Sequence, residues 1–385
     1  MNHKKTVLRY ASAAAAICCL AAGAERLIPL MESVRVGFAT YEPAVTDAVP
    51  VLKEYTESAE ISAEQGEISR TEEPLMRPAN APDDCLTVWE SDGSKAMHNA
   101  KPYKNAHGSS GGTIIEKQYT GLKGAMFFDL PGGGQVRNST FWNNNELKRE
   151  SGVLPDLKLK TDGTPMVLLY HTHTTESYQD IKSKTYDADF IFRTTEPDKN
   201  MVAVGDAIAE ELTAAGIGVI HADEIHDYPQ WNGSYSRSAK TVRAILQEYP
   251  SICIALDIHR DAINSGTSVI APVCEINGKK TAQIMVVCGC DDGTMNMPNY
   301  LQNFHLAAQI EQTAETMYPG FTRPLLFDHR KYNQHLTTGS VLIEVGSQGN
   351  TIEEAVSAGR LTGRALAKTI TILAKQQEAS HETTE

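Results

Sequence analysis

Groups that bind protons or metal ions gather at three points where an apolar segment of this sequence ends. Met166–Tyr170 and Ile252–Leu256 each lead into a polar cluster, and Ser340–Gly346 carries one glutamate among apolar residues. The side chains concerned are His171, His173, Glu176, Asp257, His259, Arg260, Asp261 and Glu344. A charge at the end of a buried strand is costly unless it is paired or bound to metal. Three such strand ends therefore predict a site.

The residue types in this set suit a catalytic zinc ion. Such an ion takes three protein ligands and keeps one position open for water, and a separate carboxylate accepts the water's proton. A single histidine at a strand end is more often a hydrogen-bonded structural residue, so the zinc hypothesis depends on the whole set. Strand alternation predicts that His171 and His173 lie on one face. One of them should bind the metal, and the other should orient it or the substrate.

Alternating strands and helices must position these groups from Pro165 onward. Apolar runs predict buried strands at 166–170, 217–222, 252–259 and 340–346. Periodic apolar residues predict helices at 200–216, 238–249, 298–318 and 351–377. Asn277-Gly278 between two apolar runs predicts a hairpin. This order predicts a three-layer α/β sandwich with a largely parallel central sheet, in which ligands bind beyond the carboxyl ends of the strands.

The chain before this domain has a different composition. Lys4, Lys5 and Arg9 precede the apolar segment Tyr10–Ala24, which predicts a signal peptide or an N-terminal membrane anchor over residues 1–26 and an exported chain. Residues 27–113 are acidic at first and then rich in glycine and serine, as in a disordered linker. The folded domain is predicted at 114–376 with its core at about 160–372, followed by a polar tail at 377–385.

Charge and cysteine content narrow the function further. The net charge of −13 argues against a nucleic-acid role, which needs clustered Lys and Arg. No Cys-x-x-Cys pair occurs, so a cysteine zinc site is not expected. Arg237, in the predicted loop before a helix, leaves two interpretations open: it orients a substrate carboxylate, or it is a solvated loop arginine.

Five motifs in this chain closely resemble the stage II sporulation protein P family of spore-forming bacteria. They are HTHTTESY from His171, YSRS from Tyr235, DIHRDA from Asp257, KYNQHL from Lys331 and LIEVGSQGNTIEEA from Leu342. The resemblance covers about Gln135 to Ala367. It implies a zinc-amidase-like fold and a zinc-dependent N-acetylmuramoyl-L-alanine amidase that hydrolyses peptidoglycan during forespore engulfment.

The same resemblance implies surroundings and partners. The chain would act at the extracytoplasmic face of the cytoplasmic membrane, anchored there or secreted to the cell-wall space. Its partners would be stage II sporulation proteins D and M. Two rival functions remain: an endopeptidase of stem-peptide cross-links, and a non-catalytic scaffold that binds the cell wall.

The resemblance also implies residue roles. His259 in DIHRDA would be a metal ligand, and Glu344 in IEVGSQGN would be the catalytic base. Either His171 or His173 would be the other histidine ligand. The acidic ligand would be Glu176, which is preferred to Glu196 because it directly follows a histidine-bearing strand. Arg260 would help to hold the oxyanion.

Overall fold

The computed structural model describes residues 85–89, 110–187, 190 and 192–382. The predicted signal or anchor segment and most of the predicted linker lie outside these residues. In the described part of the chain, no helix is long and apolar enough to cross a membrane.

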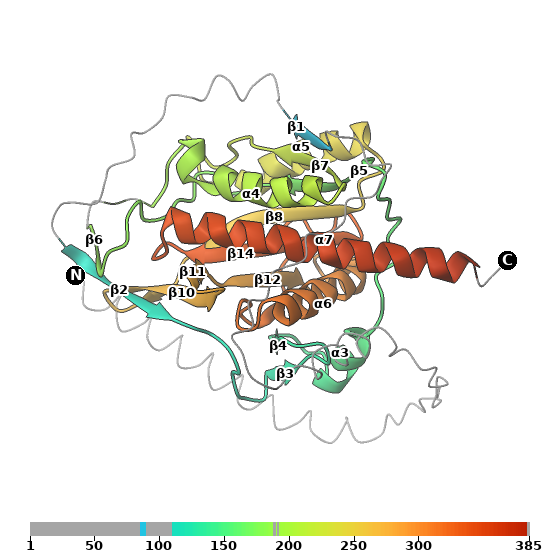
Figure 1. Cartoon of the computed structure of the whole chain (residues 1–385), viewed down its shortest axis with the longest axis horizontal. Helices are drawn as coiled ribbons and strands as arrows, with labels where there is room; N and C mark the ends of the chain where they lie inside the picture. The colour runs from blue at the N-terminus through green and yellow to red at the C-terminus, as the bar shows by residue number, and fades with distance from the viewer. Residues whose placement is uncertain (1–84, 90–109, 188–189, 191, 383–385) are drawn as a thin grey trace, which may run out of the picture. The chain divides into compact units, whose positions relative to one another are not determined.

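A nine-stranded sheet organises the domain (Figure 1). Its strands, in spatial order, are β1 (Leu86–Trp89), β7 (Gly218–Ala222), β5 (Pro165–Tyr170), β8 (Ile254–Asp261), β14 (Gly339–Ser347), β12 (Ile284–Gly289), β13 (Leu325–Asp328), β4 (Gln135–Asn138) and β3 (Phe127–Asp129). Within this sheet only the β14–β12 and β4–β3 pairs are antiparallel, so the predicted largely parallel sheet is confirmed.

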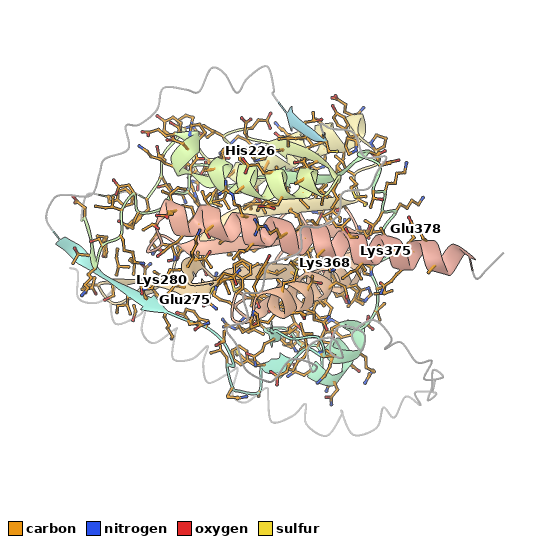
Figure 2. All side chains as sticks on the ribbon, in the orientation of Figure 1. His226, Glu275, Lys280, Lys368, Lys375 and Glu378 are labelled. Atoms are coloured by element: carbon orange, nitrogen blue, oxygen red, sulfur yellow. The ribbon has the colours of Figure 1, made fainter. Side chains whose placement is uncertain are left out.

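Helices cover both faces of this sheet. The helices α4 (Met201–Ala214), α6 (Tyr300–Met317) and α7 (Ile352–Glu382) share the larger core with one face, as Figure 1 shows. The helix α5 (Ser234–Glu248) contributes Val242 and Ile245 to a smaller core on the other face. The three-layer α/β sandwich predicted from the sequence is therefore confirmed. The last turns of α7 carry exposed charged side chains, among them Lys375 and Glu378 (Figure 2).

A second, five-stranded sheet holds the predicted hairpin. It joins β2 (Ser110–Lys117), β6 (Thr185–Asp187), β9 (Asn264–Ser265), β10 (Ser268–Ile276) and β11 (Lys279–Ala282). Asn277 and Gly278 connect β10 to β11 with φ of 51° and 73°. Two consecutive positive φ values are those of a type I′ turn, which matches the twist of the flanking strands.

The described fold extends beyond both predicted domain boundaries. At the start, β1 pairs with β7 of the main sheet and β2 begins at Ser110, although folded structure was expected only from residue 114. At the end, α7 continues to Glu382, past the expected limit at 376. Two short helices, α3 (Asn144–Glu150) and the 3-10 helix η3 (Pro197–Lys199), complete the elements.

Candidate active site

Two neighbouring strands place a histidine and a glutamate side by side. In the parallel pair β8–β14, His259 lies opposite Glu344. Residues in register on neighbouring strands point to the same face of a sheet. The imidazole and the carboxylate therefore share one face, near the carboxyl ends of both strands, as predicted for ligand sites in such folds.

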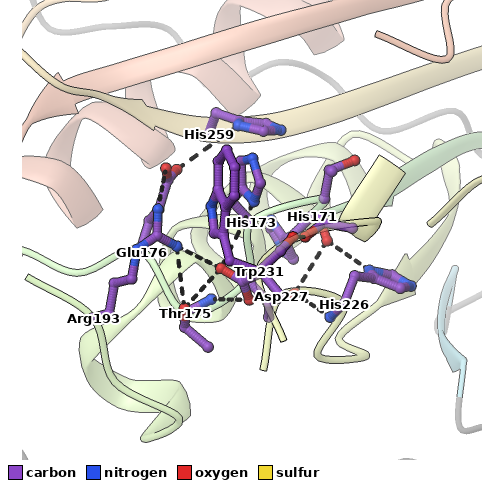
Figure 3. Close-up of polar contacts among 12 residues, drawn as sticks. His171, His173, Thr175, Glu176, Arg193, His226, Asp227, Trp231 and His259 are labelled. Atoms are coloured by element: carbon purple, nitrogen blue, oxygen red, sulfur yellow. Dashed lines mark hydrogen bonds and ion pairs between the residues drawn. The ribbon is translucent and has the colours of Figure 1, made fainter. Parts of the chain in front are cut away.

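The turn after β5 adds a second histidine and a second glutamate. The strand ends at Tyr170, and His173 and Glu176 follow in the turn. The rings of His173 and His259 meet edge to face with centroids 5.3 Å apart. Glu176 Oε2 lies 3.7 Å from His259 Nδ1 (Figure 3). The structure thus brings His173, Glu176 and His259 together beside Glu344.

Asp257 holds the ring of His259 from behind. It is fully buried, and its Oδ1 lies 2.9 Å from His259 Nε2. Thr172 fixes this carboxylate by donating from its backbone N–H at 2.8 Å and from Oγ1 at 2.6 Å. Burial opposes the charged imidazole, but Asp257 outweighs it and raises the pKa of His259 to about 10. Asp257 therefore fixes the ring so that Nδ1 faces Glu176, the arrangement in which a carboxylate supports a metal-binding histidine.

Glu176 is held by backbone and side-chain donors. The backbone N–H of Arg260 donates to Glu176 Oε2 at 3.0 Å, and Arg193 Nη2 lies 3.5 Å from Oε1. The alternative acidic ligand, Glu196, instead pairs with Lys199 at 2.8 Å on the η3 turn. Of the two glutamates, Glu176 is therefore the one placed beside His259, and its ligand role stays a prediction.

The Arg260 side chain turns away from these groups. Its neighbour His259 points to the site, and adjacent residues of a strand point to opposite faces. The guanidinium donates to the carbonyls of Asp261 at 3.0 Å and Phe192 at 3.3 Å. The structure does not place Arg260 where the expected oxyanion role requires it, and only its backbone N–H contacts the site.

Glu344 is half-buried on β14, close to several charged side chains. Burial raises its pKa to about 8, Asp261 adds to this shift, and His259 opposes it. Its Oε2 is buried and has no hydrogen-bond partner within the described residues. Nearby, Arg323 Nη1 binds Asp261 Oδ2 at 2.7 Å. A raised pKa and a free oxygen suit a group that takes up and releases a proton.

His171 belongs to a different network from His173. It is fully buried, donates from Nδ1 to Ile258 O at 3.0 Å and lies 2.9 Å from His221 through Nε2. His221 in turn contacts Asp206 on α4 at 3.0 Å. The prediction that both histidines lie on one face of the strand is wrong, because β5 ends before them and the turn sends His171 toward α4 and His173 toward α5. Of the two histidines, His173 is therefore the one that lies beside His259.

Sequence reasoning missed Arg193, Asp227 and Trp231, which position this site. Asp227 accepts from Thr175 and from Arg193, beside His173, and Trp231 stacks on the ring of His173 (Figure 3). All three lie in loops, where neither periodicity nor a strand end marks them. Arg237 is a loop clamp: it donates to the carbonyls of His226, Gln230 and Asn232. Because these three carbonyls occupy its guanidinium, Arg237 fits neither earlier interpretation. It is not a solvated loop arginine, and it is not free to orient a substrate carboxylate.

The side chains of His173, Glu176, His259 and Glu344 have the chemistry that a zinc site requires. Across the described residues, no group of three or more His, Cys, Asp or Glu side chains is already arranged as a metal cage. The chemistry of the set nevertheless fits, since His173 Nδ1 and Glu344 Oε2 are buried without hydrogen-bond partners. Two imidazoles and one carboxylate are a donor set used by catalytic zinc sites. His173, Glu176 and His259 would hold the ion, with Glu344 beside it.

The α/β fold with histidines and glutamates gathered at neighbouring strand ends defines a candidate hydrolase. The sequence model of one family, stage II sporulation protein P, matches residues 91–371. The chain therefore belongs to the stage II sporulation protein P family. A relative with this description, from Bacillus subtilis (strain 168), is 27% identical over 237 residues, which are 59% of this chain and 56% of the relative. The chain thus matches little more than half of that relative's length.

Some solved structures also match part of this chain. One is an N-acetylmuramoyl-L-alanine amidase of Nostoc punctiforme, with 11% identity, a TM-score of 0.33, and coverage of 55% of this chain and 98% of that one. Another is the catalytic domain of an N-acetylmuramoyl-L-alanine amidase from Bacillus (Paenibacillus) polymyxa, with 12% identity and the same score and coverage. At these values the likeness carries no argument about activity.

Proposed function

We propose that this chain is a zinc-dependent N-acetylmuramoyl-L-alanine amidase that cleaves peptidoglycan during sporulation. The observation that carries the proposal is the placement of Glu344 directly opposite His259, beside His173 and Glu176. Membership of the stage II sporulation protein P family supports the substrate class and the biological setting.

The chain's own residues would divide the work of hydrolysis. When bound, a zinc ion would act as a Lewis acid and would lower the pKa of a water molecule toward ~7. Glu344 would accept the proton of the attacking water and would pass it to the leaving amine of L-alanine. Asp257 would hold His259, and Asp227 and Thr175 would fix the turn that carries His173 and Glu176.

Digestion of purified peptidoglycan sacculi by the full chain tests the proposal. An amidase releases free stem peptides and leaves glycan without peptides, which chromatography and mass spectrometry resolve. A cross-link endopeptidase would instead leave shortened peptides attached to N-acetylmuramic acid. A non-catalytic scaffold would release neither product and would contain no zinc by elemental analysis. Either of the last two results would contradict the amidase proposal.

We also propose that the chain acts outside the cytoplasm, anchored to the membrane or secreted to the wall space. The basic flank and apolar segment at Tyr10–Ala24 support export. An engulfment complex with stage II sporulation proteins D and M is part of the same proposal, and co-purification from sporulating cells tests it. Protease protection of the folded domain in intact protoplasts would contradict the location.

A further inference from the structure

An exposed tryptophan lies directly against one of the candidate metal ligands. Trp231 is 55% exposed, which is unusual for so large an apolar side chain. Its ring stacks on His173 with centroids 5.1 Å apart and an interplanar angle of 9° (Figure 3). A tryptophan whose role was only to fill the core would be buried. The exposed position of Trp231 beside His173 therefore indicates another role.

The loop that carries Trp231 is held firmly in place. Arg237 donates from Nε to His226 O at 2.6 Å and from Nη1 to Asn232 O at 3.1 Å, and its Nη2 donates to Gln230 O. These three carbonyls lie on both sides of Trp231. One guanidinium therefore fixes the loop in the position that presents the indole. Binding sites gain affinity when their aromatic groups are fixed before the ligand arrives.

Two further aromatic rings continue this surface. Tyr235 meets His173 edge to face at 5.6 Å and stacks on Tyr332 at 5.3 Å with an angle of 19°. Tyr332 adopts a φ of 41°, a backbone conformation that a bulky residue rarely takes without a structural or functional reason. Both tyrosines are partly exposed. Trp231 and Tyr235 therefore lie against His173, and Tyr332 continues the row of aromatic rings through its contact with Tyr235.

We propose that the ring of Trp231 forms a platform that binds a sugar ring of the glycan strand, with Tyr235 and Tyr332 beside it as a stacked pair in a different orientation. A pyranose ring presents C–H bonds on its faces, and these pack against the face of an aromatic ring, while its hydroxyl groups stay in water. Large, rigid aromatic side chains supply such contact area at a low cost in conformational entropy. The platform would hold the sugar next to the groups that cut the bond.

Chemical connectivity explains why the platform lies beside His173, and this step rests on the proposed amidase function. In the substrate, the carbonyl that is attacked belongs to a lactyl group attached directly to the N-acetylmuramic acid ring. That sugar must therefore lie within a few bond lengths of the reacting carbonyl. Trp231 touches His173, so a ring stacked on the indole satisfies this requirement.

Binding of peptide-free glycan strands to the full-length chain, measured by isothermal titration calorimetry, tests the platform. We expect Trp231→Ala to weaken this binding about tenfold or more, since truncation of an aromatic anchor typically has that effect. Trp231→Phe, which keeps a ring, should recover part of the affinity. Phe141→Ala is the matched control: Phe141 is 96% exposed and lies outside the candidate site, so its loss should leave binding unchanged.

The outcomes separate this inference from the proposed function. Unchanged glycan binding by Trp231→Ala would overturn the platform, even if the variant lost zinc through a disturbed His173. Glycan binding that depends on Trp231 in a chain that releases no stem peptides would support the platform and contradict the amidase proposal. Thermal unfolding curves of each variant confirm that the compared proteins are folded.

Discussion

At the scale of single residues, the two histidines of the His-x-His motif make separate contacts. His171 uses both ring nitrogens inside the protein, at Ile258 O and at His221. His173 Nδ1 is buried without a hydrogen-bond partner, and the ring faces His259. A nitrogen that is already hydrogen-bonded is a poor candidate for a ligand, so the two positions should respond differently to mutation.

We predict that His173→Ala lowers zinc content roughly tenfold or more, because each ligand of a three-ligand site is needed. His171→Ala should keep most of the zinc. It should instead lower the free energy of unfolding by about 2–4 kcal/mol, because it leaves His221 Nε2 without its partner and opens a cavity. Elemental analysis and chemical denaturation measure the two effects. Equal zinc loss in both variants would contradict the assignment of His173.

The same measurement applies to His259, the second candidate histidine ligand, through the variant His259→Ala. Its zinc content should also fall roughly tenfold or more. The variant would leave Asp257 buried without its ion-pair partner, which lies 2.9 Å away in the folded chain, so stability should fall as well. Asp257→Asn in the same background separates the two effects, since it removes the unpaired charge. Full zinc occupancy in His259→Ala would exclude this residue as a ligand.

We predict that Glu344→Gln keeps both the fold and the zinc and loses turnover by roughly 10²–10⁴-fold, the usual value of general-base catalysis. Within the described residues Glu344 Oε2 has no hydrogen-bond partner, so the substitution removes no hydrogen bond at that atom. Its folded pKa of about 8 lies above the unfolded value of 4.5. In the metal-free wild type the contribution of Glu344 to stability is therefore lost as the pH rises from about 4.5 through about 8, and this contribution is absent from the glutamine variant. Near-normal turnover by a folded, zinc-loaded variant would place the base elsewhere.

A second buried glutamate gives a pH-dependent prediction outside the active site. Burial raises the pKa of Glu311 well above its usual value, and Glu311 Oε1 lies 2.8 Å from Thr322 Oγ1. The same hydroxyl lies 2.9 Å from Glu315 Oε2. One hydroxyl proton cannot serve both carboxylates, so we infer that a protonated Glu311 donates to Thr322, which donates to Glu315.

Glu311→Gln keeps a donor at this position and removes the titrating group. Because the folded pKa is raised, the contribution of Glu311 to stability is complete below its unfolded pKa and is lost as the pH rises. We predict that the variant matches the wild type in melting temperature near pH 4 and exceeds it increasingly toward pH 9. Glu315→Gln is the control: Glu315 accepts from the backbone N–H of Gly320 and Thr322, so this change should destabilise. A constant difference across the pH range would contradict the inference.

At the scale of elements, α4 approaches the His171–His221 pair most closely at Gly205, where there is no room for a side chain. A Cβ at Gly205 would lie 2.4 Å from His221 Nε2 and 2.8 Å from His171 Nε2. Alanine in a helix is ordinarily favoured over glycine by up to about 1 kcal/mol. Here the close approach to the His171–His221 pair decides against it.

We predict that Gly205→Ala lowers the free energy of unfolding by about 1–3 kcal/mol, the range for an overpacked core, despite its better helix propensity. Ser236→Ala on α5 is the control, since Ser236 is exposed and the change should alter stability little. Chemical denaturation of both variants gives the comparison. A stabilised Gly205→Ala would show that α4 can move away from the histidine pair without cost.

At the scale of the whole molecule, the sheet order brings the site together. His173 follows β5, His259 lies on β8 and Glu344 lies on β14. These three strands are far apart in the sequence but are immediate neighbours in the sheet. Because these three strands are parallel, their carboxyl ends meet at one edge. The order and direction of these strands therefore bring the residues of the site together.

The N-terminal edge of the sheet gives a prediction at this scale. β1 covers the edge of β7 with four paired residues, Leu86 to Trp89 opposite Val219 to Ala222. We expect a fragment that begins at residue 114 to melt at a lower temperature than one that begins at residue 85, because it exposes the unpaired edge of β7 and cuts into β2. Thermal unfolding of the two fragments measures the difference. Equal melting temperatures would show that β1 adds nothing to the domain.

The sequence alone determined the elements and the chemistry of the site. Apolar runs located β5, β7, β8 and β14, and helical periodicity located α4 to α7, because burial imposes these periods on the residues themselves. Charged groups at strand ends identified Glu176, His259 and Glu344, because a buried charge is costly without a partner. Both kinds of pattern are local, because each appears within a single segment of the sequence.

Only the tertiary structure decided which of these groups meet. The turn after Tyr170 separates His171 from His173, and the carbonyl of Phe192 accepts a hydrogen bond from the Arg260 guanidinium. The clamped loop with Trp231, like the strand β1, depends on partners far away in the chain. Contacts between distant residues leave no periodic pattern in the segments that make them, so no local reading of the sequence could supply them.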